Sequence, residues 1–199
     1  MAVGLCNNNG VCIADSGLAV SAKMTLTNGE VYKLGKKPKS PPTRLQFMKE
    51  VTTDSKISSV RHYRGYTYVG KVSGAIDWIN PYGQVNKAFI KLPHMVVSFA
   101  IDNERIYILG YADTASSLIC VHDLNNHKQL TSWQHPYISY FGQSVSVTHD
   151  AKLAVGDWHS KQIIIYSLTG DVIRYIPCPP LLTMTVCMSC GDGSVIISD

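Results

Sequence analysis

The chain has 199 residues, of which 45% are apolar and 16% charged, a composition typical of a folded globular domain rather than a disordered segment. It holds no apolar run of the roughly 18 residues needed to cross a bilayer, and its start lacks the basic and long apolar regions of a secretory signal. These features predict a cytoplasmic protein without a membrane partner. We therefore expect its six cysteines to be reduced thiols.

The net charge of +4 is concentrated in one segment. Residues 31–49 hold six of the 18 basic residues and no acidic residue, which leaves 12 basic and 14 acidic residues in the rest of the chain. The stretch 35–44 (GKKPKSPPTR) also contains three prolines, which do not fit the interior of a sheet. We expect residues 35–56 to form an exposed, basic, proline-rich loop insertion in a near-neutral domain.

Short runs of β-branched and aromatic residues, bounded by turns rich in Gly, Asn and Asp, cover the rest of the chain. In chain order, the predicted strands fall into four units: 2–6, 11–15, 20–26 and 31–34; 57–62, 66–70, 75–79 and 85–90; 95–101, 106–109, 118–121 and 130–133; 144–147, 153–155, 162–166 and 172–176. A fifth unit begins with strands at 184–187 and 195–197. No window shows the apolar spacing of an amphipathic helix.

The spacing of these units predicts the architecture. The ends of their second strands recur every 40 to 46 residues, apart from one interval of 56 residues that contains the insertion. A repeat of about 40 to 45 residues with four short strands is typical of a propeller blade. The sequence therefore predicts an all-β fold, a single domain over residues 1–199 that forms a β-propeller of four-stranded antiparallel blades.

The fourth unit carries a family resemblance. Val155-Gly156-Asp157 is followed by a polar turn, an Ile-containing strand and the turn Ser167-Leu168-Thr169-Gly170-Asp171, and shorter echoes occur at Ile13-Ala14-Asp15 and Ile197-Ser198-Asp199. This order is similar to the NHL repeat, although units two and three end the second strand at Gly70 and Gly110 without the Asp. The resemblance implies a six-bladed propeller, as in tripartite-motif proteins, with about four and a half blades present. Open blade edges would then favour self-association.

Two groups of residues are candidates for contacts with a partner. In the insertion, Lys36, Lys37, Lys39 and Arg44 would suit an acidic partner or a phosphate backbone, the alternative being a solvated loop. The second group interleaves cations and aromatic rings and consists of Arg61, His62, Tyr63, Arg64 and Lys71. Such mixtures bind single-stranded RNA by stacking bases and pairing phosphates, and the alternative is a polar blade edge.

Residues for metal or catalytic chemistry are sparse. Cys187 and Cys190 form one C-x-x-C pair without the further ligands that zinc requires, so we interpret the pair as structural. The histidines lack metal-ligand spacing, although His62 and His149 lie near the ends of presumed inner strands. We expect no cofactor, metal or catalytic residue, and we interpret Asp15, Asp157 and Asp199 as turn caps. Trp78, Trp133 and Trp158 are expected to fill space between blades.

The functional hypothesis that follows is a non-catalytic interaction module whose propeller face binds a protein partner. The family resemblance implies the substrate-recognition part of a tripartite-motif-like ubiquitin ligase, with any ligase activity outside this chain. The alternative is binding of single-stranded RNA through a basic propeller face. The third hypothesis is a metal-dependent propeller lyase or hydrolase with ligands contributed by several blades.

Overall fold

The computed structural model describes residues 2–6, 10–15, 18–23, 46–52, 54–112, 116–135, 144–157, 160–177, 186–189 and 195–198, with side chains for 54–111, 117–135, 144–157 and 160–177. Every regular element in these segments is a β-strand. None of the described residues belongs to a helix that could cross a membrane.

The strands form consecutive antiparallel sheets, which we call blades 1 to 5. Blade 1 holds β1 (Ala2–Cys6), β2 (Gly10–Asp15), β3 (Leu18–Lys23) and β4 (Gln46–Thr52); blade 2 holds β5 (Ile57–Tyr63), β6 (Tyr66–Lys71), β7 (Ala75–Ile79) and β8 (Val85–Lys91). Blade 3 holds β9 (Met95–Asp102), β10 (Arg105–Ala112), β11 (Ser116–Asp123) and β12 (Gln129–His135). Blade 4 holds β13 (Ser144–Val147), β14 (Leu153–Asp157), β15 (Gln162–Tyr166) and β16 (Val172–Pro177), and blade 5 holds β17 (Val186–Ser189) and β18 (Val195–Ser198).

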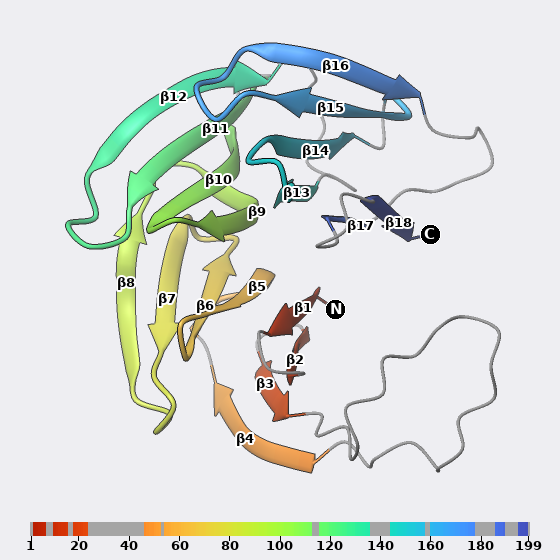
Figure 1. Cartoon of the computed structure of the whole chain (residues 1–199). Helices are drawn as coiled ribbons and strands as arrows, with labels where there is room; N and C mark the ends of the chain where they lie inside the picture. The colour runs from red at the N-terminus through yellow and green to blue at the C-terminus, as the bar shows by residue number, and fades with distance from the viewer. Residues whose placement is uncertain are drawn as a thin grey trace, which may run out of the picture.

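The blades are arranged radially. Within each four-stranded blade the strands pair in sequence order, and the first strand is innermost (Figure 1). The innermost strands are neighbours around a common axis: β5 packs beside β1 and β9, and β13 beside β9 and β17. The last strands, β8, β12 and β16, lie at the outer rim. This arrangement confirms the predicted all-β propeller, and the strands of blades 2 to 4 match their predicted positions closely.

Alternation along a strand explains how each blade is held by its neighbours. In β10, Ile106 and Ile108 pack toward blade 2, whereas Tyr107 and Leu109 pack toward blade 4. Because consecutive side chains point to opposite faces, a sheet covered on both sides requires such an unbroken apolar run. Each fully buried Ile or Leu contributes roughly 1.5–3 kcal/mol of stabilisation. The run from 106 to 109 therefore joins three blades at once.

One predicted boundary is wrong. The structure places β4 at Gln46–Thr52, paired with β3, whereas residues 35–56 were expected to form one continuous loop. The sequence QFMKEVT lacks the continuous apolar run of an inner strand. β4 is the last strand of its blade, the position in which β12 and β16 of the later blades are largely exposed. The strand expected at 31–34 and residues 35–45 of the predicted insertion lie outside the described residues.

A buried polar contact joins blade 3 to blade 4. His135 ends β12, is 2% exposed, and its Nδ1 lies 2.7 Å from the Tyr166 hydroxyl of β15. Burial lowers the pKa of His135 to about 4, although the Asp157 carboxylate acts in the opposite direction. The imidazole is therefore neutral at neutral pH. Asp157 itself accepts the Ser160 N–H at 3.2 Å, which confirms its predicted turn-capping role.

Acidification is expected to weaken this junction. An unfolded histidine has a pKa of about 6.5, so between that pH and about 4 the unfolded chain binds a proton that folded His135 does not. The stabilising contribution of neutral His135 is therefore complete above about pH 6.5 and decreases by up to ~3 kcal/mol toward pH 4. Urea unfolding at pH 7 and pH 4.5 should show a smaller acid-induced loss of stability for His135→Gln than for wild type. Equal losses would contradict this assignment.

Candidate functional site: the turn face of blades 2 and 3

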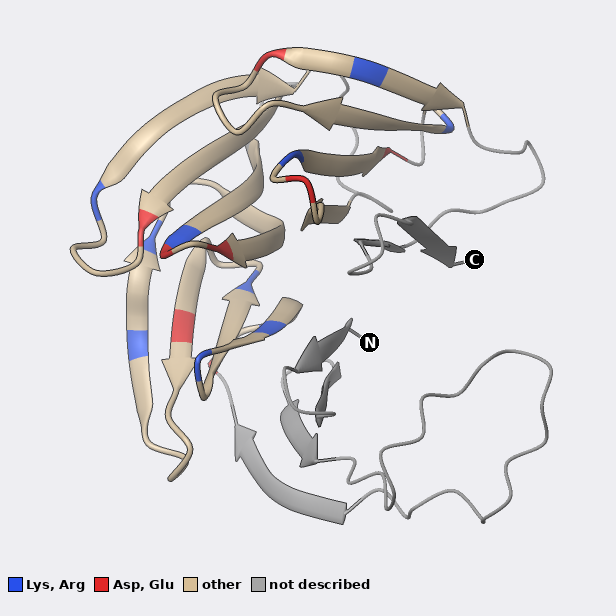
Figure 2. Ribbon diagram, in the orientation of Figure 1, with Lys and Arg blue, Asp and Glu red and all other residues tan. Residues whose placement is uncertain are grey.

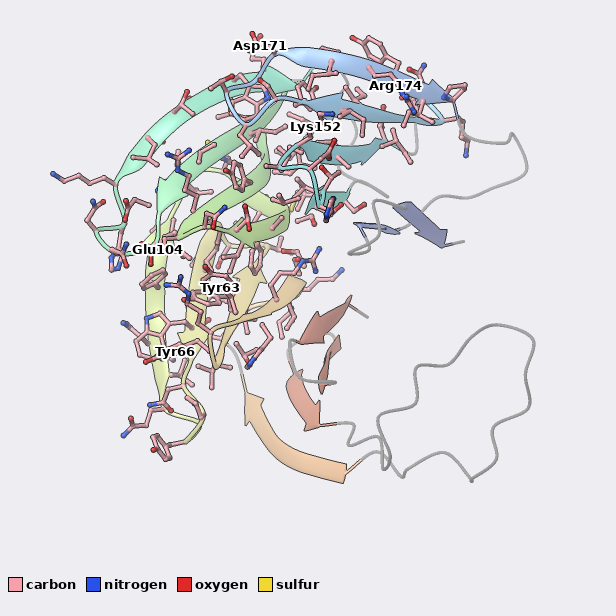
Figure 3. The ribbon with its side chains drawn as sticks, viewed as in Figure 1. Tyr63, Tyr66, Glu104, Lys152, Asp171 and Arg174 are labelled. Carbon is pink, nitrogen blue, oxygen red and sulfur yellow. The ribbon has the colours of Figure 1, made fainter. Side chains whose placement is uncertain are left out.

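The turns after the first and third strands of each blade lie at one end of the propeller, because the innermost strands run in the same direction and successive strands alternate. We call this end the turn face, formed in blades 2 to 4 by residues 64–65, 80–84, 103–104, 124–128, 148–152 and 167–171. Figure 3 shows Tyr63, Tyr66 and Glu104 near one another where blades 2 and 3 meet on this face. The site is built around them.

Glu104, in the β9–β10 turn, ties blade 3 to the predicted contact residues of blade 2. Its carboxylate pairs with the Arg64 guanidinium and accepts a hydrogen bond from the Asn125 amide at 2.9 Å. Its backbone N–H donates to the Tyr63 hydroxyl at 3.4 Å, and the Arg64 guanidinium lies 5.2 Å from the centre of the Tyr63 ring. The hydrogen bonds from Asn125 and Arg64 lower the pKa of Glu104. Arg64 is therefore already neutralised by an acidic neighbour.

Lys71 is not placed to contact a partner. Its side chain is 3% exposed, and its Nζ lies 2.8 Å from Oδ2 of buried Asp77 and 2.7 Å from Oδ1 of half-exposed Asp54. The other Asp77 oxygen accepts the backbone N–H of Ala88, a residue with a left-handed φ of 50° at an irregularity between β7 and β8. Lys71 thus belongs to a structural ion pair within blade 2, which corrects its predicted role as a surface contact.

Replacement of each carboxylate in turn should show how much the buried contact and the exposed contact each contribute to the free energy of unfolding. Asp77→Asn leaves the Lys71 ammonium buried beside a solvated carboxylate and is expected to cost about 3 kcal/mol of unfolding free energy. Asp54→Asn has the same isosteric change on the exposed partner and should cost less than about 1 kcal/mol. Urea denaturation of the two variants measures the difference. Similar losses in both would show that burial of the pair does not determine its strength.

A row of aromatic rings crosses the outer strands of blade 2. Tyr66 contacts Trp78 edge-to-face at a centroid distance of 5.0 Å, Trp78 contacts Phe89 at 6.4 Å, and Phe89 contacts the His127 ring of blade 3 at 4.0 Å. These residues come from β6, β7, β8 and the β11–β12 turn. Tyr66 is 39% exposed. The row therefore begins at the turn face and continues into the junction with blade 3.

Tyr82 lies at the tip of the β7–β8 turn and is 83% exposed. Asn80 rigidifies this turn: its Oδ1 accepts the N–H groups of Tyr82 at 3.0 Å and Gln84 at 2.9 Å, and its carbonyl accepts Gly83 N–H at 2.9 Å. A Cβ on Gly65 would lie 3.8 Å from Pro81, so this turn touches the β5–β6 turn that precedes Tyr66. Sequence reasoning identified the turn but missed Tyr82, which the Asn-Pro-Tyr-Gly signature could have indicated.

The charges of the turn face are balanced. Its acidic residues are Glu104, Asp150 and Asp171, and its basic residues are Arg64, Lys128 and Lys152. Lys152 lies 2.6 Å from Asp150, and hydrogen bonds from Lys152 and Thr148 lower the pKa of Asp150 to about 2. Figure 2 shows both signs interspersed over blades 2 to 4. The basic face expected for RNA binding is thus not formed here by the described residues, and Lys36, Lys37, Lys39 and Arg44 lie outside them.

Other predicted residues have local roles. His62 Nδ1 lies 3.3 Å from the Thr67 hydroxyl, and His149 is exposed in the β13–β14 turn. Among the described residues, no group of three or more His, Cys, Asp or Glu side chains could hold a metal ion. Trp133 packs against the core between blades 3 and 4, as predicted, with its ring centre 6.1 Å from that of Tyr166. The side chains of Cys187, Cys190 and Trp158 lie outside the described part.

The fold defines the chain as a β-propeller, and the described turns of blades 2 to 4 carry exposed aromatic residues and balanced charge. No protein-family model and no curated protein match its sequence. The NHL resemblance therefore stays a prediction.

Comparison with solved structures agrees with the fold. A streptogramin B lyase structure superposes with a TM-score of 0.69 at 12% identity, over 99% of this chain and 61% of that chain. The virginiamycin B lyase of Staphylococcus aureus gives a TM-score of 0.65 at 12% identity, over 99% of this chain and 62% of that chain. A chain of the mitotic checkpoint complex gives a TM-score of 0.63 at 12% identity, over 87% of this chain and 48% of that chain. The chain thus spans about three fifths of the lyases, and these likenesses establish the propeller fold alone.

Proposed function

We propose that this chain is a non-catalytic propeller module that binds a protein partner through the turn face of blades 2 and 3. The observation that carries the proposal is Tyr82, an aromatic side chain 83% exposed on a turn held by Asn80. The neighbouring turn contributes the partly exposed ring of Tyr66. Tyr, Trp and Arg are the residues that most often dominate the binding energy of protein interfaces.

The rigidity of the turns on this face also favours partner binding. A partner that binds a flexible loop must order it, which costs about 0.5–1.5 kcal/mol for each immobilised side chain. The three hydrogen bonds to Asn80 order the Tyr82 turn in advance. The Glu104 contacts to Tyr63, Arg64 and Asn125 fix the adjoining surface in the same way. The face is therefore preorganised, and aromatic anchors on it would bind with little loss of entropy.

The charges of the described residues favour a protein over a nucleic acid. RNA binding depends on cations that are free to replace the counterions of phosphates. Arg64 is paired with Glu104, Lys152 with Asp150, and Lys71 is buried between two carboxylates. A mixed surface of this kind suits the polar rim of a protein interface. If the chain belongs to a longer tripartite-motif-like ligase, this face would recognise the substrate.

Catalysis is the competing hypothesis, because two structural neighbours are lyases. The described residues provide no metal-ligand group, and burial raises the pKa of the Cys120 thiol to about 11, which keeps it unreactive. The exposed aromatic residues of the turn face support a binding role instead. Conversion of virginiamycin B by the purified chain above the rate of a heat-denatured control would overturn that assignment.

Replacement of the exposed anchor tests the proposal. The tagged chain is incubated with extract of the cells that express it, and bound proteins are identified with and without ribonuclease. Tyr82→Ala should reduce retention of a specific, ribonuclease-resistant partner roughly 30-fold, since truncation of an interface hot spot costs about 2 kcal/mol or more. Tyr175→Ala is the matched control, because Tyr175 is also exposed, at 49%, but lies on the rim strand β16.

Three outcomes would contradict the proposal. Equal retention of the partner by the Tyr82 and Tyr175 variants would place the interface elsewhere. Loss only in the Tyr175 variant would assign binding to the outer rim. Loss of the partner after ribonuclease treatment would favour RNA recognition instead.

A further inference from the structure

Among the predicted contact residues that the structure describes, Arg61 extends its side chain toward the propeller axis. It lies on β5, the innermost strand of blade 2, yet its Nη2 donates to the Val145 carbonyl on β13 of blade 4 at 3.4 Å. The guanidinium passes 6.0 Å from the ring centre of Phe99, which belongs to the intervening blade 3. Strands β5 and β13 are separated by β9 around the ring, so a side chain that reaches from one to the other must cross near the centre.

The Arg61 charge has no counter-charge among the described residues. Its hydrogen bonds go to two backbone carbonyls, that of Val60 at 2.8 Å and that of Val145 at 3.4 Å. Burial lowers the pKa of Arg61 to about 10, and no acidic side chain in the described segments acts in the opposite direction. Arg61 is still charged at neutral pH. Arg64, by contrast, is exposed and its charge is paired with the Glu104 carboxylate.

The sequences of the innermost strands explain this imbalance. The five strands β1, β5, β9, β13 and β17 read AVGLC, ISSVRHY, MVVSFAID, SVSV and VCMS. Their one acidic residue, Asp102, is the last residue of β9 and adjoins the turn face. Their one Lys or Arg residue is Arg61. In β5, β9 and β13, the innermost strands whose side chains the structure describes, Arg61 is thus the one permanent cation among mainly apolar and hydroxyl residues.

We propose that Arg61 forms a binding site at the axis for a small oxyanion, the carboxylate or phosphate group of a small molecule. A guanidinium has five N–H donors, and its contacts with the described residues engage two of them. Carboxylate and phosphate groups can accept two parallel hydrogen bonds from adjacent guanidinium N–H donors, and charge-assisted bonds of this type are the strong ones. An uncompensated, partly desolvated cation is costly, so an anion that pairs with it would stabilise the folded chain. The site is separate from the turn-face aromatics and does not depend on the proposed function.

The test is a titration of the whole 199-residue chain with inorganic phosphate and, separately, with acetate. Sodium chloride keeps the ionic strength constant, and calorimetry measures binding to wild type, Arg61→Gln and Arg64→Gln. Saturable binding should be at least about tenfold weaker in Arg61→Gln, the loss expected when a hydrogen-bonded charge is removed. Arg64→Gln should bind like wild type. Tighter phosphate binding would identify a phosphate site, and tighter acetate binding a carboxylate site.

The second measurement covers the case in which Arg61→Gln does not fold. The Nε–Hε resonances of arginine in wild-type protein are followed by NMR during the same titrations, with Arg61 assigned from Arg61→Lys. A saturable shift of the Arg61 resonance, with the Arg64 resonance unchanged, is expected. The proposal is overturned if neither anion shifts the Arg61 resonance, if wild type shows no saturable binding, or if a folded Arg61→Gln binds with unchanged affinity.

Discussion

The structure depends on the burial of each blade from both sides. Ile106 and Ile108 of β10 face blade 2 while Tyr107 and Leu109 face blade 4, and all four are at most 1% exposed. A single four-stranded sheet with two apolar faces is not stable when both faces are exposed to water, so neighbouring blades must cover it. That requirement arranges the first strands around one axis and gathers the turns at one end. Both candidate sites follow from this packing.

The two sites differ in how their charges are compensated. On the turn face, Arg64 and Lys152 are balanced by Glu104 and Asp150, which leaves the exposed rings of Tyr66 and Tyr82 as the distinctive surface groups. At the axis, Arg61 has only backbone carbonyls as partners among the described residues. An exposed, neutralised aromatic surface suits a macromolecule, whereas a partly buried, uncompensated cation suits a small anion. One propeller can therefore present both without overlap.

The fold could be predicted because turn chemistry and apolar runs are local properties. The strands of blades 2 to 4 lie between turns rich in Gly, Asn and Asp, and these boundaries are readable from the sequence. β4 was missed because a rim strand needs no apolar run, and a proline-rich segment precedes it. The spacing of the repeats indicated a propeller, but its subfamily depends on a strand-end Asp that units two and three lack.

The site was less predictable because it depends on which blades meet. Arg61, Arg64 and Lys71 are close in sequence and appeared equivalent as cations. Pairing across blades places Arg61 at the axis, joins Arg64 to Glu104 forty residues later, and buries Lys71 against Asp77. None of these partners can be identified from local sequence. Tyr82 was overlooked for a different reason, since the feature that makes it notable is its exposure, which local sequence does not report.

Hydroxyl-radical footprinting of the chain, alone and in complex with its co-purified partner, tests the central claim most directly. Tyrosine oxidation reports the accessibility of each ring. The account predicts that the complex protects Tyr82 and Tyr66 while the oxidation of Tyr175 on the rim stays unchanged. Protection of Tyr175 with full oxidation of Tyr82 would contradict the assignment of the turn face as the binding surface.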